Sequence, residues 1–353
     1  MELNTFLSGA QIDVLSTVYI VLLTPSVIGS FSVLVVSIAR WQHLKEQVHI
    51  LVQLALADLL AALILMSMSL MNKIPTVNSI VICQYGLPLS LTFYFISFLL
   101  VVAYAWKSKN VIQGWRERPA DDEGDLNTCR REEIVIPVYA IVWMIPLALY
   151  LAYVLTPFMK ATLLIPATSG VPNGVISNDS TYCTSCILFL HVWRNSCSDV
   201  ETIHDVFIRA FLFIVVIPVM VSCSIIYYKI GKWYERRDPE GLFPVEGDGR
   251  SRRRMKRAIS TARNMVTVIL ICWAPALFLI LLSTLLMRTN VEQRSLFGFY
   301  MIQAASVSLQ GFLNSMVYAW RRPNFTEAVL GESTPLVAYN HMPFFDESLR
   351  TSF

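Results

Sequence analysis

The sequence predicts an all-α membrane protein whose core is a seven-transmembrane helix bundle. Its 353 residues are 55% hydrophobic and 15% charged, whereas soluble domains carry about 25% charged residues. A helix needs about 20 apolar residues to cross the hydrocarbon core of a bilayer. Seven segments reach that length, at residues 14–39, 48–71, 79–106, 134–155, 202–228, 259–287 and 296–320.

A short eighth helix is predicted after the last span. Beyond Pro323, the apolar residues Phe325, Ala328 and Val329 recur at helical spacing. This pattern is typical of an amphipathic helix lying on a membrane surface, here the inner leaflet, over residues 321–331. The chain then divides into an extracellular N-terminus at 1–13, the bundle at 14–320, this amphipathic helix and a cytoplasmic tail at 332–353.

The distribution of Lys and Arg predicts the orientation. If the loops after spans one, three and five share a side with the C-terminal tail, those segments hold 21 of the 28 Lys and Arg residues, and Arg263 lies at the adjoining end of span six. Positive residues concentrate on the cytoplasmic side of a membrane, so the N-terminus is expected outside and the C-terminus inside. Basic residues gathered at a membrane face indicate the lipid bilayer as their partner and argue against nucleic-acid binding.

Four of the seven cysteines lie at the predicted outer face, one at the outer end of span three and three in the loop before span five. An even number of cysteines in an oxidising compartment predicts disulfide bonds, and four cysteines allow three pairings. We favour Cys83–Cys197, which would tie the outer end of span three to the loop before span five. Cys183–Cys186 would then close a small local ring.

The loop over residues 156–201 is the longest segment expected outside. It contains Asn178-Asp179-Ser180, an acceptor sequence that predicts glycosylation of Asn178. The loop could cap a ligand pocket, or it could be a disulfide-fixed lid with no ligand beneath it.

Asp58 is the only carboxylate deep within a predicted span. Ionisable residues are costly in hydrocarbon and indicate functional sites, so Asp58 needs polar partners from other helices. An ionised Asp58 could hold Na⁺ with such partners, or burial could keep the carboxyl protonated. A hydrogen-bonded packing residue without an ion is the alternative, and no other metal or cofactor is expected. The candidate partners are Ser30, Ser97, Gln310 and Asn314.

Span six contains Cys272-Trp273-Ala274-Pro275. Pro275 removes a backbone N–H and crowds the preceding turn, which predicts a kink. A small movement near Trp273 would therefore become a larger one at the inner end of the helix. In span seven, Asn314 and Tyr318 are four residues apart and share one helix face.

These motifs together resemble those of the rhodopsin-like G-protein-coupled receptors, over about residues 14–330. Each motif alone is weak, but together they follow one another at matching depths in the spans. They are Leu54 to Asp58 in span two, Cys83 at the outer end of span three, Trp143 in span four, Pro218 in span five, Cys272 to Pro275 in span six, and Asn314, Tyr318 and Phe325 at the end of span seven.

Three departures separate the chain from the pattern of that family. Lys107-Ser108-Lys109 stands where the family carries Asp-Arg-Tyr, so the arginine that engages a G protein is missing. Ser30 replaces the asparagine of span one, and Ser315 replaces the proline of Asn-Pro-x-x-Tyr. The chain is interpreted as an outlying orphan member with some likeness to cyclic-AMP-receptor-like proteins.

The resemblance implies a role for each motif. Trp273, Pro275 and Pro218 would form a switch, with Asp58 and Asn314 in a polar relay beside it. Tyr318 would make the contact at the inner end of span seven. Ser90 stands where amine receptors carry Asp, and span seven has no Lys, so amines and retinal are disfavoured as ligands. A small or lipidic ligand or a ligand-free core remains, among Ser90, Phe93, Tyr94, Trp273, Tyr300 and Gln303.

Two inner features point to partners. Thr351-Ser352-Phe353 at the C-terminus fits a peptide that adds as a strand to a PDZ domain. A basic cluster before span six could anchor to anionic lipid, or it could contact a heterotrimeric G protein or another cytosolic signalling protein. The members of this cluster are Arg250, Arg252, Arg253, Arg254, Lys256 and Arg257.

The function expected from the sequence is that of an orphan receptor-like protein, most simply in the plasma membrane, which transmits a stimulus through span six. The alternative is a receptor-fold protein that does not activate G proteins and acts as a partner or scaffold, as Lys107-Ser108-Lys109 suggests. An enzyme is not expected, because no nucleophile–base or metal constellation is present. A transporter is disfavoured by the odd number of spans and the lack of an inverted repeat.

Overall fold

The computed structural model of this chain describes most of the helical bundle. The described residues are 7–39, 41–74, 79–114, 126–155, 186–189, 208–210, 212–222, 224–225, 228, 232, 249–286 and 293–317. They are helical apart from short turns, and this part of the chain contains no strand. The prediction of an all-α protein is confirmed for these residues.

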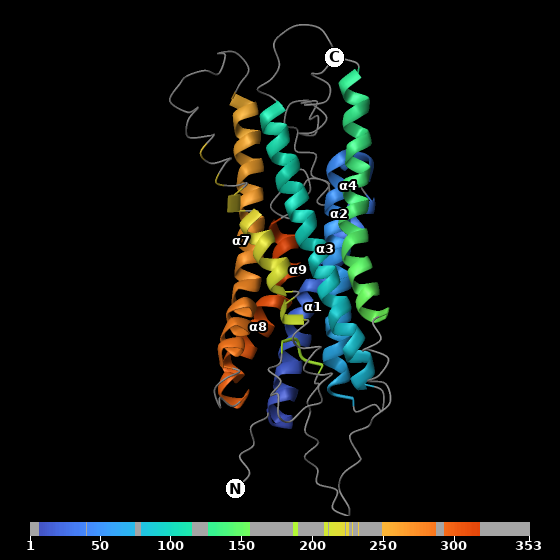
Figure 1. Ribbon diagram of the computed structural model, residues 1–353. Helices are drawn as coiled ribbons and strands as arrows, with labels where there is room; N and C mark the ends of the chain where they lie inside the picture. The colour runs from blue at the N-terminus through green and yellow to red at the C-terminus, as the bar shows by residue number, and fades with distance from the viewer. Residues whose placement is uncertain are drawn as a thin grey trace, which may run out of the picture.

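Long helices run side by side through the bundle (Figure 1). An apolar helix over Ile208–Ser222 accompanies them, shown in yellow in Figure 1. The helices are α1 (Gly9–Ala39), α2 (Trp41–Met71), α3 (Ser79–Gly114), α4 (Leu126–Leu155), α7 (Gly249–Leu286), the 3₁₀ turn η2 (Gln293–Leu296), α8 (Phe297–Ser308) and α9 (Gln310–Ser315).

Six of these helical stretches are long and apolar enough to cross a bilayer, so the chain is a multi-span α-helical membrane protein. They correspond to the predicted spans one, two, three, four, six and seven. Span five is represented by the shorter helix Ile208–Ser222. The predicted amphipathic helix at 321–331 lies outside the described residues. The six are Gly9–Ala39, His49–Met71, Tyr85–Trp106, Val138–Leu155, Asn264–Leu285 and Arg294–Ser315.

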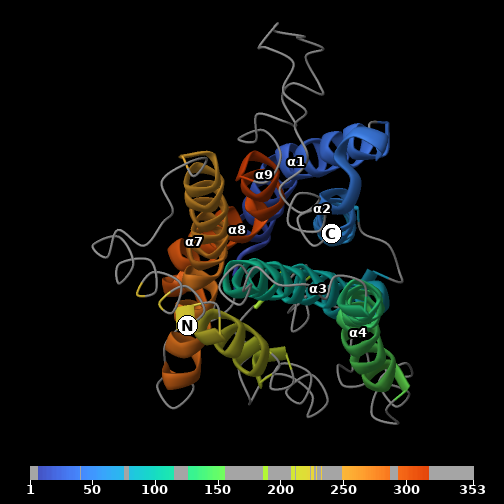
Figure 2. The same ribbon diagram turned by 90° about the horizontal axis from the view of Figure 1, so that it is seen from above.

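Viewed along the bundle, α8 and α9 lie between α1 and α7, while α3 lies near the centre and α4 at the edge (Figure 2). Aromatic residues fill the middle, and Trp273, Tyr19, Tyr300 and Phe98 are among the largest fully buried side chains. The outward faces of α1 and α4 expose large apolar residues such as Ile28 and Met144. Apolar residues face outward without penalty because lipid tails are as apolar as the core.

Span seven is interrupted at Leu309, where α8 ends and α9 begins. In an unbroken helix the N–H of Phe312 would bond to the carbonyl of Ser308. Here the hydroxyl of Ser26 from α1 donates to the Ser308 carbonyl at 2.5 Å and accepts from the Phe312 N–H at 3.1 Å. Insertion of a side chain into the backbone ladder is a recognised cause of a helix bend. The Ser26 hydroxyl thus takes the place of the missing backbone hydrogen bond at the break in span seven.

Two glycines allow α1 and α9 to approach closely. A Cβ placed on Gly311 would lie 3.0 Å from Ser30 Oγ and 3.4 Å from the backbone oxygen of Ser26. A Cβ on Gly29 of α1 would lie 3.1 Å from Ser315 Oγ. Small residues at a helix interface let the two backbones pack against each other in a membrane. This packing positions Ser26 against the break in span seven.

We expect Gly311→Val to lower the stability of the bundle by about 2 kcal/mol, because the added methyl groups would meet the backbone of α1. Gly298→Val, in the same span, is the matched control, since a Cβ at Gly298 meets no atom within 4 Å. The control should change stability by less than about 0.5 kcal/mol. Unfolding curves of both variants in mixed detergent micelles measure the difference, and equal losses would contradict the close approach.

Candidate functional site

Asp58 lies near the middle of α2 in an apolar stretch and is 2% exposed. Both of its carboxylate oxygens accept hydrogen bonds from side-chain amides of span seven. Gln310 Nε2 donates to Asp58 Oδ1 at 3.2 Å, and Asn314 Nδ2 donates to Asp58 Oδ2 at 2.7 Å. Gln310 and Asn314 are four residues apart, so both side chains leave the same face of the helix.

Gln310 connects this pair of helices to two more. Its Nε2 also donates to Ser97 Oγ of α3 at 3.3 Å, and its Oε1 accepts the indole N–H of Trp273 from α7 at 2.5 Å. An amide side chain has two N–H donors and one carbonyl acceptor. Gln310 therefore uses both donors and its acceptor on three other helices. We call Asp58, Ser97, Trp273, Gln310 and Asn314 the polar network.

Trp273 is 1% exposed and is enclosed by aromatic rings. The ring centroids of Tyr94 and Phe98 from α3 lie 5.2 and 5.1 Å from that of Trp273, both nearly edge-on. Phe189 approaches from another segment with a centroid distance of 6.4 Å. Edge-to-face pairs of this kind are favourable beyond the area that they bury. A rotation of Trp273 would disturb all three ring contacts and its hydrogen bond to Gln310.

The structure thus brings together the predicted candidates Asp58, Ser97, Gln310 and Asn314. Their role as a relay stays a prediction. Ser30, the remaining candidate, is buried, and its hydroxyl has no hydrogen-bond partner; the Oδ1 atom of Asn314 has none either. These two oxygens are of the type that a hard cation prefers, but amide N–H groups already satisfy both oxygens of Asp58. Sodium at Asp58 accordingly also stays a prediction.

Ser90 and Gln303, which the sequence suggested for a ligand pocket, form hydrogen bonds with other groups of the protein. The Ser90 hydroxyl donates to the Ala61 carbonyl of α2 at 3.1 Å. Gln303 and the Tyr19 hydroxyl hydrogen-bond at 3.0 Å and join α8 to α1. Both members of the latter pair are buried.

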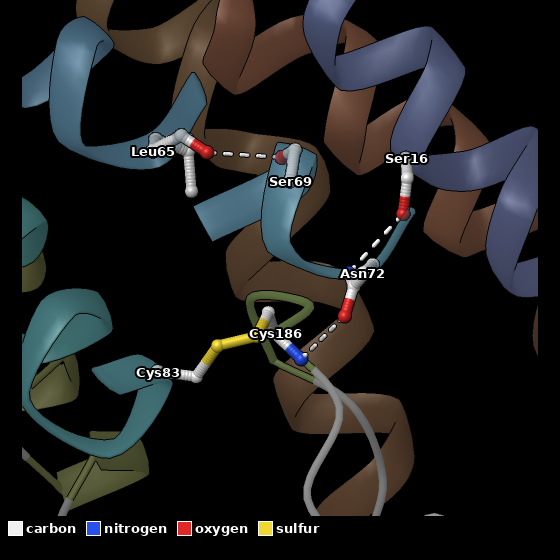
Figure 3. The surroundings of a disulfide bond; sticks show 6 residues. All are labelled: Ser16, Leu65, Ser69, Asn72, Cys83 and Cys186. Atoms are coloured by element: carbon white, nitrogen blue, oxygen red, sulfur yellow. Dashed lines mark hydrogen bonds between the residues drawn. A yellow bond between two sulfur atoms is a disulfide. The ribbon is translucent and has the colours of Figure 1, made fainter. Parts of the chain in front are cut away.

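The disulfide prediction is wrong in its pairing. Cys83 at the start of α3 is bonded to Cys186, not to Cys197, with 5.2 Å between the Cα atoms (Figure 3). Cys186 is therefore also not available to Cys183. The backbone N–H of Cys186 donates to Asn72 Oδ1 at 3.1 Å, which holds this cysteine beside the ends of α2 and α3. We call this end of the bundle the disulfide end.

The segment that carries Cys186 enters the core of the bundle. Cys186, Ile187, Leu188 and Phe189 are all at most 7% exposed. Phe189 has φ = 63°, the only positive φ of a non-glycine residue in the described part of the chain. Such a conformation costs on the order of 1–3 kcal/mol and persists only where surrounding contacts impose it. We call residues 186–189 the inserted segment.

Arg209, in the apolar helix Ile208–Ser222, is a buried cation that is not among the site residues predicted from the sequence. It is 6% exposed, and its Nη1 atom donates to the hydroxyl of Ser283 and to Thr284 Oγ1, both on α7. A basic residue inside a span is a functional candidate by default, which is the signal that could have identified it. These hydrogen bonds join helix Ile208–Ser222 to the part of α7 that lies C-terminal to Trp273.

The remaining predicted site residues fall into two groups. Pro218 lies in the helix Ile208–Ser222, Pro275 lies within the continuous helix α7, and the basic cluster occupies the first turns of α7. Residues outside the described part of the chain are Asn178, Cys183, Cys197, Tyr318 and the C-terminal tail.

A comparison with curated proteins gives no match. The model of one family, described as transmembrane protein 116, matches residues 12–334, a range that contains every residue of the polar network and of the inserted segment. The chain therefore belongs to the transmembrane protein 116 family.

Proposed function

We propose that the chain is a receptor-like membrane protein of seven helices that transmits a stimulus through movement of α7. The observation that carries this proposal is the hydrogen-bond path from Trp273 on α7 through Gln310 to Asp58. Through this path, a change in the position of α7 alters contacts on α2, α3 and α9 together. The motifs shared with rhodopsin-like receptors support the same interpretation.

The length of α7 supports amplification of such a movement. Its 38 residues extend over about 57 Å at 1.5 Å per residue, well beyond a hydrocarbon core of about 30 Å. Trp273 and Pro275 lie toward its disulfide end, so most of the helix lies on the other side of them. A tilt about these residues therefore displaces the basic cluster at the start of α7, where a cytosolic partner would bind.

The second candidate function is a membrane partner or scaffold that does not activate G proteins. Lys107-Ser108-Lys109 near the end of α3 favours it, because the arginine of the Asp-Arg-Tyr motif of rhodopsin-like receptors is missing. The polar network would then stabilise one arrangement of the helices. A PDZ domain at the C-terminus and lipid or cytosolic protein at the basic cluster are the partners that fit this function, and a plasma-membrane location fits both functions.

We expect expression of the chain to raise nucleotide exchange on at least one member of a panel of heterotrimeric G proteins, with Gln310→Leu abolishing the increase. Surface labelling of both proteins controls for delivery to the membrane. A panel without any response, at confirmed delivery, contradicts signalling through G proteins. Proximity labelling then tests the scaffold function, which predicts partners that are lost when Arg252, Arg253 and Arg254 are neutralised.

A further inference from the structure

The inserted segment lies inside the bundle and is held there by contacts with the ends of α2 and α3, and the end of α2 is in turn joined to α1. Cys186 is bonded through its sulfur to Cys83 of α3 and through its backbone N–H to Asn72 at the end of α2 (Figure 3). The other end of the Asn72 amide donates to Ser16 Oγ of α1 at 3.1 Å. A salt bridge of 3.0 Å between Lys73 and Asp13 joins the same two helices nearby. Covalent and polar contacts thus fix the start of the segment.

Beyond Cys186 the contacts are apolar. Ile187, Leu188 and Phe189 belong to the same buried cluster as Trp273, and they are 3%, 1% and 7% exposed. The left-handed backbone at Phe189 is unfavourable for a bulky residue in isolation. The surrounding contacts hold it, and one of them is the edge-on contact with Trp273. Phe189 is therefore placed by the bundle rather than by its own backbone preference.

The space beside Trp273 is occupied by the chain itself. A cavity of about 20 Å³ lies elsewhere, lined by Pro88, Leu91, Thr92, Leu149, Tyr150, Tyr153 and Ile208. That volume is near the size of one water molecule. The residues that form ring contacts or a hydrogen bond with Trp273 are different ones from those that line this cavity. Phe189 instead supplies an aromatic ring at Trp273, where the sequence leaves open a small or lipidic ligand or a ligand-free core.

We propose that the inserted segment acts as a covalently tethered occupant of the core and sets the resting state of Trp273, so that withdrawal of Phe189, rather than arrival of a diffusible ligand, is the input at this site. The role of the inserted segment at Trp273 does not depend on the function proposed above. Only the movement of α7 that would follow the withdrawal of Phe189 rests on that function. The state of Trp273 itself is measurable without any signalling partner.

The test uses the full chain labelled with 5-fluorotryptophan in lipid nanodiscs, with the Trp273 fluorine resonance assigned from Trp273→Phe. We expect Phe189→Gly to shift this resonance, because the ring beside the indole is removed and the backbone is free to relax. Toluene, which fits a cavity left by an aromatic ring, should move the resonance back. Leu149→Ala is the control, since Leu149 lines the separate cavity, and it should leave the Trp273 resonance in place.

Reduction of the native chain supplies a second route to the same state. Breaking Cys83–Cys186 removes the tether, so a phosphine reductant should produce a second Trp273 resonance at the position found for Phe189→Gly. A Trp273 resonance that stays unchanged after reduction and in the variant would overturn the proposal. If Phe189→Gly does not fold, Phe189→Leu and reduction of the native chain decide the outcome by the same comparison.

A second measurement distinguishes this inference from the proposed function. Spin labels are placed at the first turns of α2 and α7, which lie away from the disulfide end, and the distance between them is measured. A shifted Trp273 resonance together with a changed distance supports both. A shifted resonance with an unchanged distance retains the tethered occupant and contradicts transmission through α7.

Discussion

Replacing Gln310 by leucine is expected to lower the stability of the folded bundle by about 3 kcal/mol. The substitution conserves approximate volume but removes the partner of three buried groups, namely Asp58 Oδ1, Ser97 Oγ and the indole N–H of Trp273. A buried polar group left without a partner costs about 1–3 kcal/mol, although hydrogen bonds between membrane helices average only about 0.6 kcal/mol because the unfolded helices find other partners. Unfolding in mixed micelles, followed by circular dichroism, measures the loss.

Gln303→Leu is the matched control for this prediction. Gln303 is the same residue type in the same span and is equally buried, but the described hydrogen bonds of its side chain go to a single group, the Tyr19 hydroxyl. The control should therefore lose about 1 kcal/mol. If the two leucine variants were equally stable, the polar network would not be a joint between helices, and the proposed path from Trp273 to Asp58 would lose its energetic basis.

Removal of the Cys83–Cys186 disulfide is expected to lower stability by about 4 kcal/mol. The bond joins residues that are 103 positions apart, and in the chain-entropy model a closed loop of about 100 residues stabilises a protein by up to about 5 kcal/mol. Cys83→Ser and Cys186→Ser should each produce the loss, and the double variant should lose no more than either single variant. Thermal unfolding of the three variants in nanodiscs provides the measurement.

Cys197→Ser distinguishes this pairing from the one that the sequence favoured. We expect peptide mapping of this variant to recover the cross-link between Cys83 and Cys186 unchanged. A free Cys83 thiol in the Cys197→Ser variant would instead support the predicted Cys83–Cys197 bond. Losses that added together in the Cys83→Ser/Cys186→Ser double variant would also argue against a direct bond, since the two residues would then act independently.

The spans and most members of the polar network were predictable because hydrocarbon imposes simple rules. A stretch of about 20 apolar residues must cross or be buried, and Asp58 in such a stretch must find polar partners on other helices. Few polar side chains are available at that depth, so Ser97, Gln310 and Asn314 could be named as candidates. The bond from Trp273 to Gln310 was not predicted, because an indole N–H leaves no distinctive pattern in an apolar sequence.

Two features failed to be predicted for different physical reasons. The disulfide was misassigned because spacing does not select among the three pairings of four cysteines, and the hydrogen bond from Cys186 to Asn72 is formed only in the folded bundle. The insertion of Ser26 into span seven leaves no signal either. Hydroxyls in these spans commonly bond to the carbonyl four residues earlier in their own helix, as Ser67 and Ser69 do, and the sequence does not distinguish Ser26 from them.

The contact of Ser26 with span seven has a consequence for assembly of the protein. A carbonyl and an N–H of the last span have their hydrogen-bond partner in a side chain of the first span. During synthesis the first span enters the membrane while the last has yet to be made. The final shape of α8 and α9 must therefore wait for α1 to dock beside them, because lipid offers no hydrogen bond to the exposed backbone groups in the meantime. The first and last spans therefore reach their final structure together. A chain that lost its first helix would lack the hydroxyl that bonds to the backbone at the break in its last span.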